Sequence, residues 1–342
     1  MSARPFLVLF ANGLFVVGGV GCVIDTSGLR SRDGGTVEDS GSGSDGAAPD
    51  APAIDGGGNT DGGPAVDAGD AGADTGAGAD AGPPVLGPFG EPTQILPLAH
   101  DATDDDPTLP RDRLELYFNS NRSGSSQIWV SRRASTADAW GAPVAEGDLN
   151  SPEGETSPEI APDGLTMWLA SRRGGRTQYD IFVATRPRRT DRWSTPTVVT
   201  ELSGPTDDTS PGPAPSLQRM VLGRDLTGSN DLFEVTRPGP TALWGVPVPI
   251  ATLNTATFNE SNGCWEPSEL RLWLDWNDTP GGDADIHVAE RPTLAEPFAR
   301  PVPVAELNTT DDEHDPWISE DLRHVVFVSD RTGNAEIWEA SR

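Results

Sequence analysis

Positively charged residues are scarce in this sequence. The 342 residues include 24 lysines and arginines against 53 aspartates and glutamates, so the formal net charge is −29. Twelve of the acids lie between Asp25 and Asp80, and the remainder of the chain is therefore less extreme. A charge of this sign repels phosphate groups, which argues against nucleic acid and anionic lipid headgroups as partners.

Cysteine is nearly absent as well. The chain has two cysteines, Cys22 and Cys264. We expect Cys22 to carry lipid, for the reason given below, which leaves Cys264 without a partner and excludes a disulfide framework. The folded part must therefore be stabilised by packing. We interpret Cys264 as a buried small apolar residue, because no histidine or asparagine at a recognised spacing supports a nucleophile.

Motifs of catalysis and metal binding are also missing. The sequence contains no Gly-x-Ser-x-Gly, His-Glu-x-x-His or P-loop pattern. Its four histidines show no paired metal-ligand spacing: His100, His287, His314 and His324. Only His314 lies among acids, and we interpret it as a solvated loop residue. The sequence therefore predicts neither a catalytic residue nor an enzyme.

The sequence also lacks an apolar run that is long enough to span a membrane as a helix. The apolar stretch from Phe6 to Val20 has about 15 residues, fewer than the roughly 20 that a membrane-spanning helix needs. The following Gly19-Val20-Gly21-Cys22 resembles a bacterial lipobox, a motif that usually has a large aliphatic residue where Gly19 stands. The resemblance implies a cleaved signal peptide, residues 1–21, and lipid on Cys22. Plain secretion is the alternative.

Residues 22–85 differ in composition from the rest of the chain. From Thr26 to Ala81 they are mostly Gly, Ala, Asp and Ser, without any aromatic residue. Such a segment cannot bury enough apolar surface to offset the entropy of ordering, so we expect a disordered linker. The sequence thus predicts an exported lipoprotein, periplasmic or anchored in the outer membrane, that contacts the membrane through its lipid only.

Five repeats fill residues 86–342. A short β-type motif recurs at steps of 53, 51, 54 and 51 residues: Ile128-Trp129-Val130, Ile181-Phe182-Val183, Leu232-Phe233-Glu234, Ile286-His287-Val288 and Ile337-Trp338-Glu339. A period near 50 in β-rich units is typical of propeller blades. The sequence therefore predicts an all-β fold, a five-bladed β-propeller.

A second marker runs from an aromatic residue to a proline, as in Trp193-Ser194-Thr195-Pro196. The fifth repeat stops at Arg342 before it reaches this marker, whereas an additional copy, Phe89-Gly90-Glu91-Pro92, precedes the first repeat. We therefore expect Phe89 to Leu98 to supply the outer strand of the last blade. Closure of this kind leaves only short, protected edges.

The strands of one blade can be placed in the second repeat. We expect the innermost strand at Ser157 to Ala161, the second at Thr166 to Ser171, the third at Gln178 to Thr185 and the outermost at Trp193 to Leu202. Neighbouring blades bury both faces of each sheet, which accounts for apolar runs such as Val325-Val326-Phe327.

These units are similar to the WD-repeat-like propeller repeats of TolB-type periplasmic proteins. The likeness is carried by Ser157-Pro158, Pro162-Asp163-Gly164, Ser171-Arg172-Arg173 and Asp180-Ile181-Phe182-Val183, and by Ser120-Asn121-Arg122 and Ser329-Asp330-Arg331 in other repeats. Repeats three and four lose the Ser-x-Arg element, since they have Arg224-Asp225-Leu226 and Trp276-Asn277-Asp278. The resemblance covers the whole folded part and implies the fold rather than an activity.

One carboxylate recurs three residues before the first proline of a repeat, or before Gly263 in the fourth. These repeat acids are Asp104, Glu155, Asp208, Glu260 and Glu313. We expect each to lie where the chain enters an innermost strand, so that the five converge around one end of the central channel. A ring of acids is costly unless its members are hydrogen-bonded, paired with arginine or bound to a cation.

Two interpretations of the repeat acids stay open. One is a site for Ca²⁺ or another hard cation, built from several carboxylate oxygens. The other is that each acid caps a loop or pairs with a repeat arginine such as Arg122, Arg173 or Arg331. Further acids, including Asp105, Asp106, Asp312 and Asp315, make this end of the channel strongly negative.

The function that we expect is non-enzymatic binding or scaffolding at the cell envelope. An envelope protein or a peptidoglycan-associated protein would be the partner, and the loops before the innermost strands would form the interaction surface. A carbohydrate-binding or glycoside-hydrolysing propeller is the alternative, with Asp104, Glu155 and Glu260 as candidate carboxylates. A purely structural surface protein is the third hypothesis.

Overall fold

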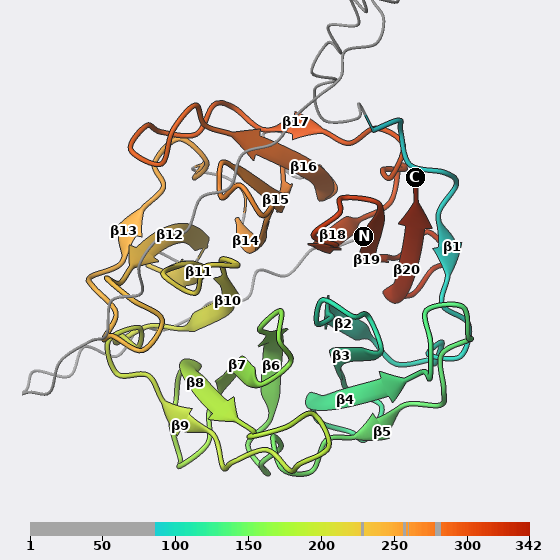
Figure 1. Ribbon diagram of the computed structural model, residues 1–342, viewed down its shortest axis with the longest axis horizontal. Coiled ribbons are helices and arrows are strands. Elements are labelled where there is room, and N and C mark those ends of the chain that lie inside the picture. The colour runs from blue at the N-terminus through green and yellow to red at the C-terminus, as the bar shows by residue number, and fades with distance from the viewer. Residues whose placement is uncertain (1–85, 227–228, 256–257, 259, 278–281) are drawn as a thin grey trace, which may run out of the picture. The chain divides into compact units, whose positions relative to one another are not determined.

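A computed structural model describes residues 86–226, 229–255, 258, 260–277 and 282–342. The predicted signal peptide, Cys22 with its predicted lipid, and the predicted linker lie outside the described residues. Regular structure in the described part of the chain consists of strands, which form five four-stranded antiparallel sheets. The sheets stand around a central axis as the blades of a propeller (Figure 1), so the predicted fold class is confirmed. No helix that could span a membrane occurs among these residues.

Each blade runs from an inner strand at the axis to a short outer strand. Blade 1 contains β2 (Asp104–Thr108), β3 (Glu115–Ser120), β4 (Gln127–Arg132) and β5 (Val144–Ala145). Blade 2 contains β6 (Glu155–Ile160), β7 (Thr166–Ser171), β8 (Asp180–Thr185) and β9 (Thr197–Val198). Blade 3 contains β10 (Asp208–Pro213), β11 (Arg219–Asp225), β12 (Asn230–Thr236) and β13 (Val248–Pro249). Blade 4 contains β14 (Ser261–Trp265), β15 (Arg271–Trp276), β16 (Asp285–Glu290) and β17 (Val302–Pro303).

Blade 5 combines the two ends of the folded part. Its inner three strands are β18 (Glu313–Ile318), β19 (His324–Ser329) and β20 (Glu336–Ser341), and its outer strand is β1 (Thr93–Gln94). Thr93 pairs with Glu339 and Gln94 pairs with Trp338. Figure 1 shows β1 beside β20. The predicted closure of the last blade by an N-terminal strand is therefore confirmed.

The core lies between the blades. One cluster, for example, joins Tyr117 and Ile128 of blade 1 to Met167 and Leu169 of blade 2, and all four side chains are fully buried. The second strand of each blade is covered on both faces, which is why its sequence is apolar without alternation. The outer strands are shorter than expected, because the prolines of the aromatic-to-proline marker cannot donate to a ladder.

Every inner strand carries a β-bulge at the second residue after its repeat acid. The residue there has a left-handed backbone, with φ between 49° and 53° at Asp106, Ser157, Ser210, Asn262 and Asp315. The pairing register of each inner strand shifts at the same point. A bulge re-aims the side chains around it, and these five residues accordingly meet at the axis.

Glycine takes the place of proline after the bulge of blade 4. A Cβ added to Gly263 would lie 2.6 Å from Cγ1 of Val221, and one added to Gly212 would lie 2.1 Å from the carbonyl oxygen of Gly263. Blades 3 and 4 thus approach each other at the axis more closely than a side chain permits. Bulk at either position would push these two inner strands apart.

Candidate functional site

The repeat acids lie at or directly before the start of the inner strands, and all five are fully buried. Four of them are paired with an arginine of the same blade. The nitrogen-to-oxygen distances are 2.5 Å for Arg122 and Asp104, 3.0 Å for Arg173 and Glu155, 2.5 Å for Arg224 and Asp208, and 3.1 Å for Arg331 and Glu313.

The same arginines hold the end of the preceding outer segment. Arg122, Arg224 and Arg331 donate to the carbonyl oxygens of leucines at 2.9, 3.0 and 2.7 Å, and Arg173 donates to that of Leu149. Each arginine therefore ties an inner strand to the loop that enters it, which is a structural task repeated in every such blade. In blade 3 the arginine of this pair is Arg224 itself, so loss of the Ser-x-Arg pattern did not remove the contact.

In blade 4 a tryptophan, and not an arginine, holds the end of the preceding outer segment. The indole of Trp276 donates to the carbonyl oxygen of Leu253 at 2.8 Å, as the arginines do elsewhere. Glu260 accepts from the backbone N–H of Thr255 at 2.8 Å, while its Oε2 has no hydrogen-bond partner among the described residues. Burial raises the pKa of Glu260 above its usual value.

These contacts bear on both hypotheses for the repeat acids. Their partners are arginines and backbone groups, the arrangement that the second interpretation predicts. A cation ring at these positions stays a prediction, and it would require four arginine contacts to be broken. Asp104, Glu155 and Glu260 are fully buried, so a saccharide could not reach them in this conformation of the chain.

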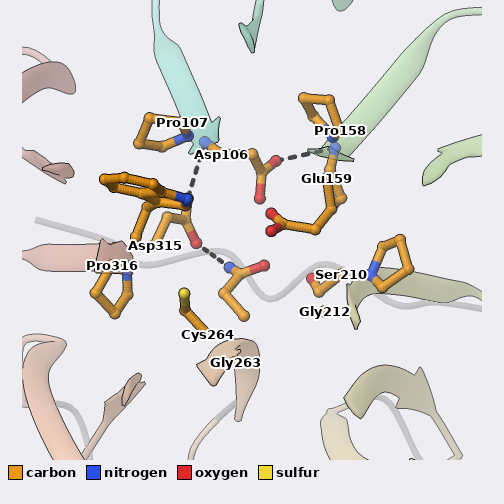
Figure 2. A pocket seen from close by; sticks show the side chains of 14 residues that line it. Asp106, Pro107, Pro158, Glu159, Ser210, Gly212, Gly263, Cys264, Asp315 and Pro316 are labelled. Atoms are coloured by element: carbon orange, nitrogen blue, oxygen red, sulfur yellow. Dashed lines mark hydrogen bonds between the residues drawn. The ribbon is translucent and has the colours of Figure 1, made fainter. Parts of the chain in front are cut away.

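A different set of acids meets at the axis, and most of them lie one to four residues after a repeat acid in an inner strand. Figure 2 shows the carboxyl groups of Asp106 and Glu159 directed toward each other, with Asp315 on the next blade. Two further acids, Asp105 in β2 and Asp275 in β15, lie beside them. We call these five residues the axial acids: Asp105, Asp106, Glu159, Asp275 and Asp315.

Hydrogen bonds link the axial acids from blade to blade. The backbone N–H of Asp106 donates to Oδ2 of Asp315 at 3.1 Å, and that of Ser157 donates to Oδ2 of Asp106 at 3.1 Å (Figure 2). The side-chain amide of Asn262 donates to Oδ1 of Asp315. Nδ1 of His314 lies 3.1 Å from Oδ2 of Asp315.

The axial acids carry more negative charge than their neighbours compensate. The chain contains no lysine. No arginine of the described residues forms an ion pair with any of the five, so His314 is the one basic group in contact with them there. A cluster of this kind binds protons or another cation, because like charges at short range disfavour ionisation of every member.

The pKa values of the axial acids are raised. Burial raises the pKa of Glu159 to about 8, that of Asp106 to about 7 and that of Asp275 to about 7. Burial and the neighbouring Asp315 hold the pKa of Asp105 well above its usual value. Burial opposes a charge on His314, but the carboxylates of Asp315 and Asp105 outweigh it and raise the histidine pKa.

The space between the axial acids is small. Asp106, Glu159 and Asp315 line a cavity of about 40 Å³, which has room for a few waters at the roughly 10–15 Å³ that one water requires. Glu159, Cys264 and Trp317 also border a second cavity of about 40 Å³, which extends to Arg111 and Glu320. The channel is therefore divided, and neither part has room for a sugar ring.

Glu159 gives the stability of the fold a pH dependence. With a pKa of about 8 against a usual 4.5, the folded chain retains a proton that the unfolded chain releases. Stability from this group is complete below about pH 4.5 and is lost as the pH rises toward 8. We expect Glu159→Gln to raise the melting temperature at pH 8 by about 2–6 °C, since roughly 1–2 kcal/mol is recovered.

The pH test compares Glu159→Gln with the wild type at pH 5 and pH 8 in the presence of EDTA, by calorimetry. The gain should be confined to pH 8. The exposed Glu153 of the same blade supplies the control, because Glu153→Gln removes a carboxylate that burial does not penalise. A gain of the same size at both pH values would show that packing, and not titration, is responsible.

Two sequence-based interpretations can be compared with the structure, and three tryptophans of blade 4 can be placed beside them. The prediction of a solvated loop is wrong for His314, which lies in β18 with a side chain only 24% exposed. Cys264 is half-buried and borders the cavity, and burial raises its thiol pKa, which opposes a nucleophilic role. Trp265, Trp273 and Trp276 are buried in the core, and none is free to stack on a ligand.

The axial acids left a signal in the sequence. Two residues after the repeat acid, repeats one and five have Asp106 and Asp315, where the others have serine or asparagine. Functional residues tend to break a repeat, and this break could have identified them. The repeat acids attracted attention because they recur, whereas recurrence reflects the shared structure of the blades.

Comparison with known proteins identifies a fold and no family. No family model matches the sequence and no curated protein matches it. Among solved structures, the α-L-arabinofuranosidase PaAbf62A of Podospora anserina aligns with a TM-score of 0.51 and 13% identity, covering 73% of this chain and 94% of that one. A family 117 glycoside hydrolase of Zobellia galactanivorans has a TM-score of 0.50 and 12% identity, with coverage of 74% and 90%.

TolB of Acinetobacter baumannii is also among the similar structures, with a TM-score of 0.44 and 13% identity. The alignment covers 72% of this chain but only 56% of that TolB. Identities at this level show a shared β-propeller and nothing about activity. The function therefore has to be inferred from the site.

Proposed function

We propose that this chain is a non-enzymatic binding module of the bacterial cell envelope, held to a membrane by lipid on Cys22. Its partner is an envelope protein that presents a basic surface, and it binds at the end of the propeller where the inner strands begin. The observation that carries the proposal is the gathering of exposed acids at that end of the propeller, around a channel with no room for a sugar ring.

Exposed acids extend the same charge over the rim of the channel. One precedes the inner strand in blades 1, 2 and 5, and another lies between β15 and β16. None forms an ion pair with an arginine of the described residues, and we call them the rim acids: Asp101, Glu153, Asp283 and Asp311. A concentration of one charge at one end steers a partner of opposite charge and accelerates its association.

The rim acids supply the test of the proposal. The full chain with Asp101→Arg and Asp311→Arg is expected to lose binding of its envelope partner at least tenfold, because attraction becomes repulsion. Binding should also weaken as salt rises. The measurement is quantitative capture from detergent-solubilised envelopes, followed by titration of the captured protein in purified form.

A control with the same change of charge is available at the opposite end. Asp138 and Glu296 are exposed and lie in the loops between the third and outer strands of blades 1 and 4. Asp138→Arg with Glu296→Arg should leave capture unchanged. Equal loss in both double variants would mean that net charge, and not the rim, governs binding, and the proposal would be abandoned.

Glycoside hydrolysis is the second candidate, favoured by one observation. Glu159 holds a proton near neutral pH and lies beside Asp106, and hydrolysis of a glycosidic bond requires one protonated and one ionised carboxyl. The small cavity weighs against it. Release of reducing sugar from arabinan, lost in Glu159→Gln, would replace the binding module with this function.

A further inference from the structure

The strand junction that closes the propeller contains three side chains with metal-binding atoms. Asp105 comes from β2 of blade 1, and His314 and Asp315 come from β18 of blade 5. One atom from each lies within 4.8 Å of the other two. The closure of the ring therefore brings the carboxylate of Asp105 to the imidazole of His314 and the carboxylate of Asp315, which are more than 200 residues away in sequence.

The separations suit a metal ion of modest size. Nδ1 of His314 lies 3.4 Å from Oδ1 of Asp105 and 3.1 Å from Oδ2 of Asp315. Ligands at about 2.0–2.1 Å from a tetrahedral metal ion are roughly 3.3 Å apart. The three atoms thus stand at nearly the spacing of neighbouring ligands, and little movement is needed to bind one ion.

A third carboxylate lies beside this group. Asp275 is only 4% exposed, and its Oδ1 has no hydrogen-bond partner among the described residues. The backbone N–H of Asp315 contacts the carboxyl group of Asp275, which also interacts with His314. A buried carboxylate oxygen without a partner is costly unless a cation or a proton satisfies it.

The carboxyl groups of Asp105 and Asp315 are close enough together to hold one shared proton or cation. They lie within hydrogen-bonding reach of each other, so both cannot be ionised unless something positive lies between them. Other contacts already hold Asp315 in place, since Asn262 and the backbone of Asp106 donate to it. Ligands oriented by such outer contacts are typical of metal sites.

We propose that Asp105, His314 and Asp315 bind one divalent transition-metal ion of the Zn²⁺ or Mn²⁺ class, with Asp275 as a further carboxylate beside it. Imidazole favours ions of this class over Ca²⁺, which prefers six or more oxygen ligands. The site is distinct from the repeat acids and from the rim acids, and it does not depend on the proposed partner. It joins blade 1 to blade 5 and so reinforces the closure of the ring.

The site is tested with the full chain after treatment with EDTA. Titration calorimetry with Zn²⁺ should show one site per chain, and the melting temperature should rise by several degrees when Zn²⁺ saturates it. Co²⁺ should give the visible absorption of a four-coordinate ion. Mn²⁺ and Ca²⁺ are titrated in parallel, and we expect Ca²⁺ to bind at least tenfold more weakly than Zn²⁺.

Two variants remove single ligands with little change of shape. His314→Gln and Asp105→Asn should each weaken Zn²⁺ binding at least a hundredfold and abolish the Co²⁺ absorption. His100→Gln is the matched control, because His100 is exposed and its imidazole accepts a hydrogen bond from the nearby backbone N–H of Ala102. The twelve acids between Asp25 and Asp80 are present in every variant and contribute the same background.

Several outcomes would overturn the site. Absence of stoichiometric Zn²⁺ binding by the wild type would do so, as would equal binding by wild type and His314→Gln when the melting temperatures without metal agree. Tighter binding of Ca²⁺ than of Zn²⁺ would indicate a site built from oxygen ligands alone, and would contradict the role of the His314 imidazole as a ligand. No partner protein enters these measurements, so their failure leaves the test with the rim acids unaffected.

Discussion

Deletion of residues 89–98 is expected to destroy the cooperative unfolding transition, or to lower the melting temperature by more than 10 °C. The segment contributes β1 and three side chains that are at least 95% buried, Phe89, Ile95 and Leu98. Burial of each contributes roughly 1.5–3 kcal/mol, and their sum is comparable with the entire stability of a domain. Removal would also expose the edge of β20 to pairing with other chains.

The control for this prediction is deletion of residues 26–81, which we expect to change the melting temperature little. Both variants should be measured by calorimetry and by size-exclusion chromatography. The shorter deletion should aggregate through the open edge, whereas the longer one should elute as a single species. Equal melting temperatures for the two variants would refute closure of the last blade by the N-terminal strand.

Arg173→Met is expected to destabilise the chain by about 3–5 kcal/mol. The substitution preserves much of the side-chain length but leaves Glu155 buried without its arginine, and an uncompensated buried charge has a cost of this size. The carbonyl oxygen of Leu149 loses a donor in the same step. Denaturant unfolding at pH 7, with the slope of the transition held in common, measures the effect.

The arginine prediction has two internal checks. Arg188 is exposed, so Arg188→Met should change the free energy of unfolding by less than about 0.5 kcal/mol. Adding Glu155→Gln to Arg173→Met should restore part of the loss, since the buried charge is then removed with its partner. A double variant as unstable as the sum of the single ones would show that the two residues act separately.

The fold could be predicted from the sequence because its signals repeat. Each blade uses the same apolar second strand and the same aromatic-to-proline marker, and the displaced copy from Phe89 revealed the closure of the ring. The ends of the strands were predicted less accurately. β6 begins at Glu155 and not at Ser157, and β9 has only two residues. Backbone hydrogen bonding decides these ends, and prolines in the outer segment restrict it.

The site could be predicted only in its location and sign. The sequence placed a strongly negative charge at the end where inner strands begin, and the structure has the axial acids there. It favoured the repeat acids, however, because they recur in every blade, and the arginines that it offered as their partners do pair with them. The bulge that directs Asp106 and Asp315 to the axis, and the approach of Asp275 from blade 4, depend on tertiary structure.

The most direct test of the proposed binding face is photo-crosslinking in living cells. A photoreactive phenylalanine derivative replaces Asp311 at the rim or, in a second strain, Glu296 at the opposite end. Binding at the rim predicts a crosslinked envelope protein from position 311 and none from position 296. The same crosslinked protein from both positions in equal yield, or from position 296 alone, would contradict it.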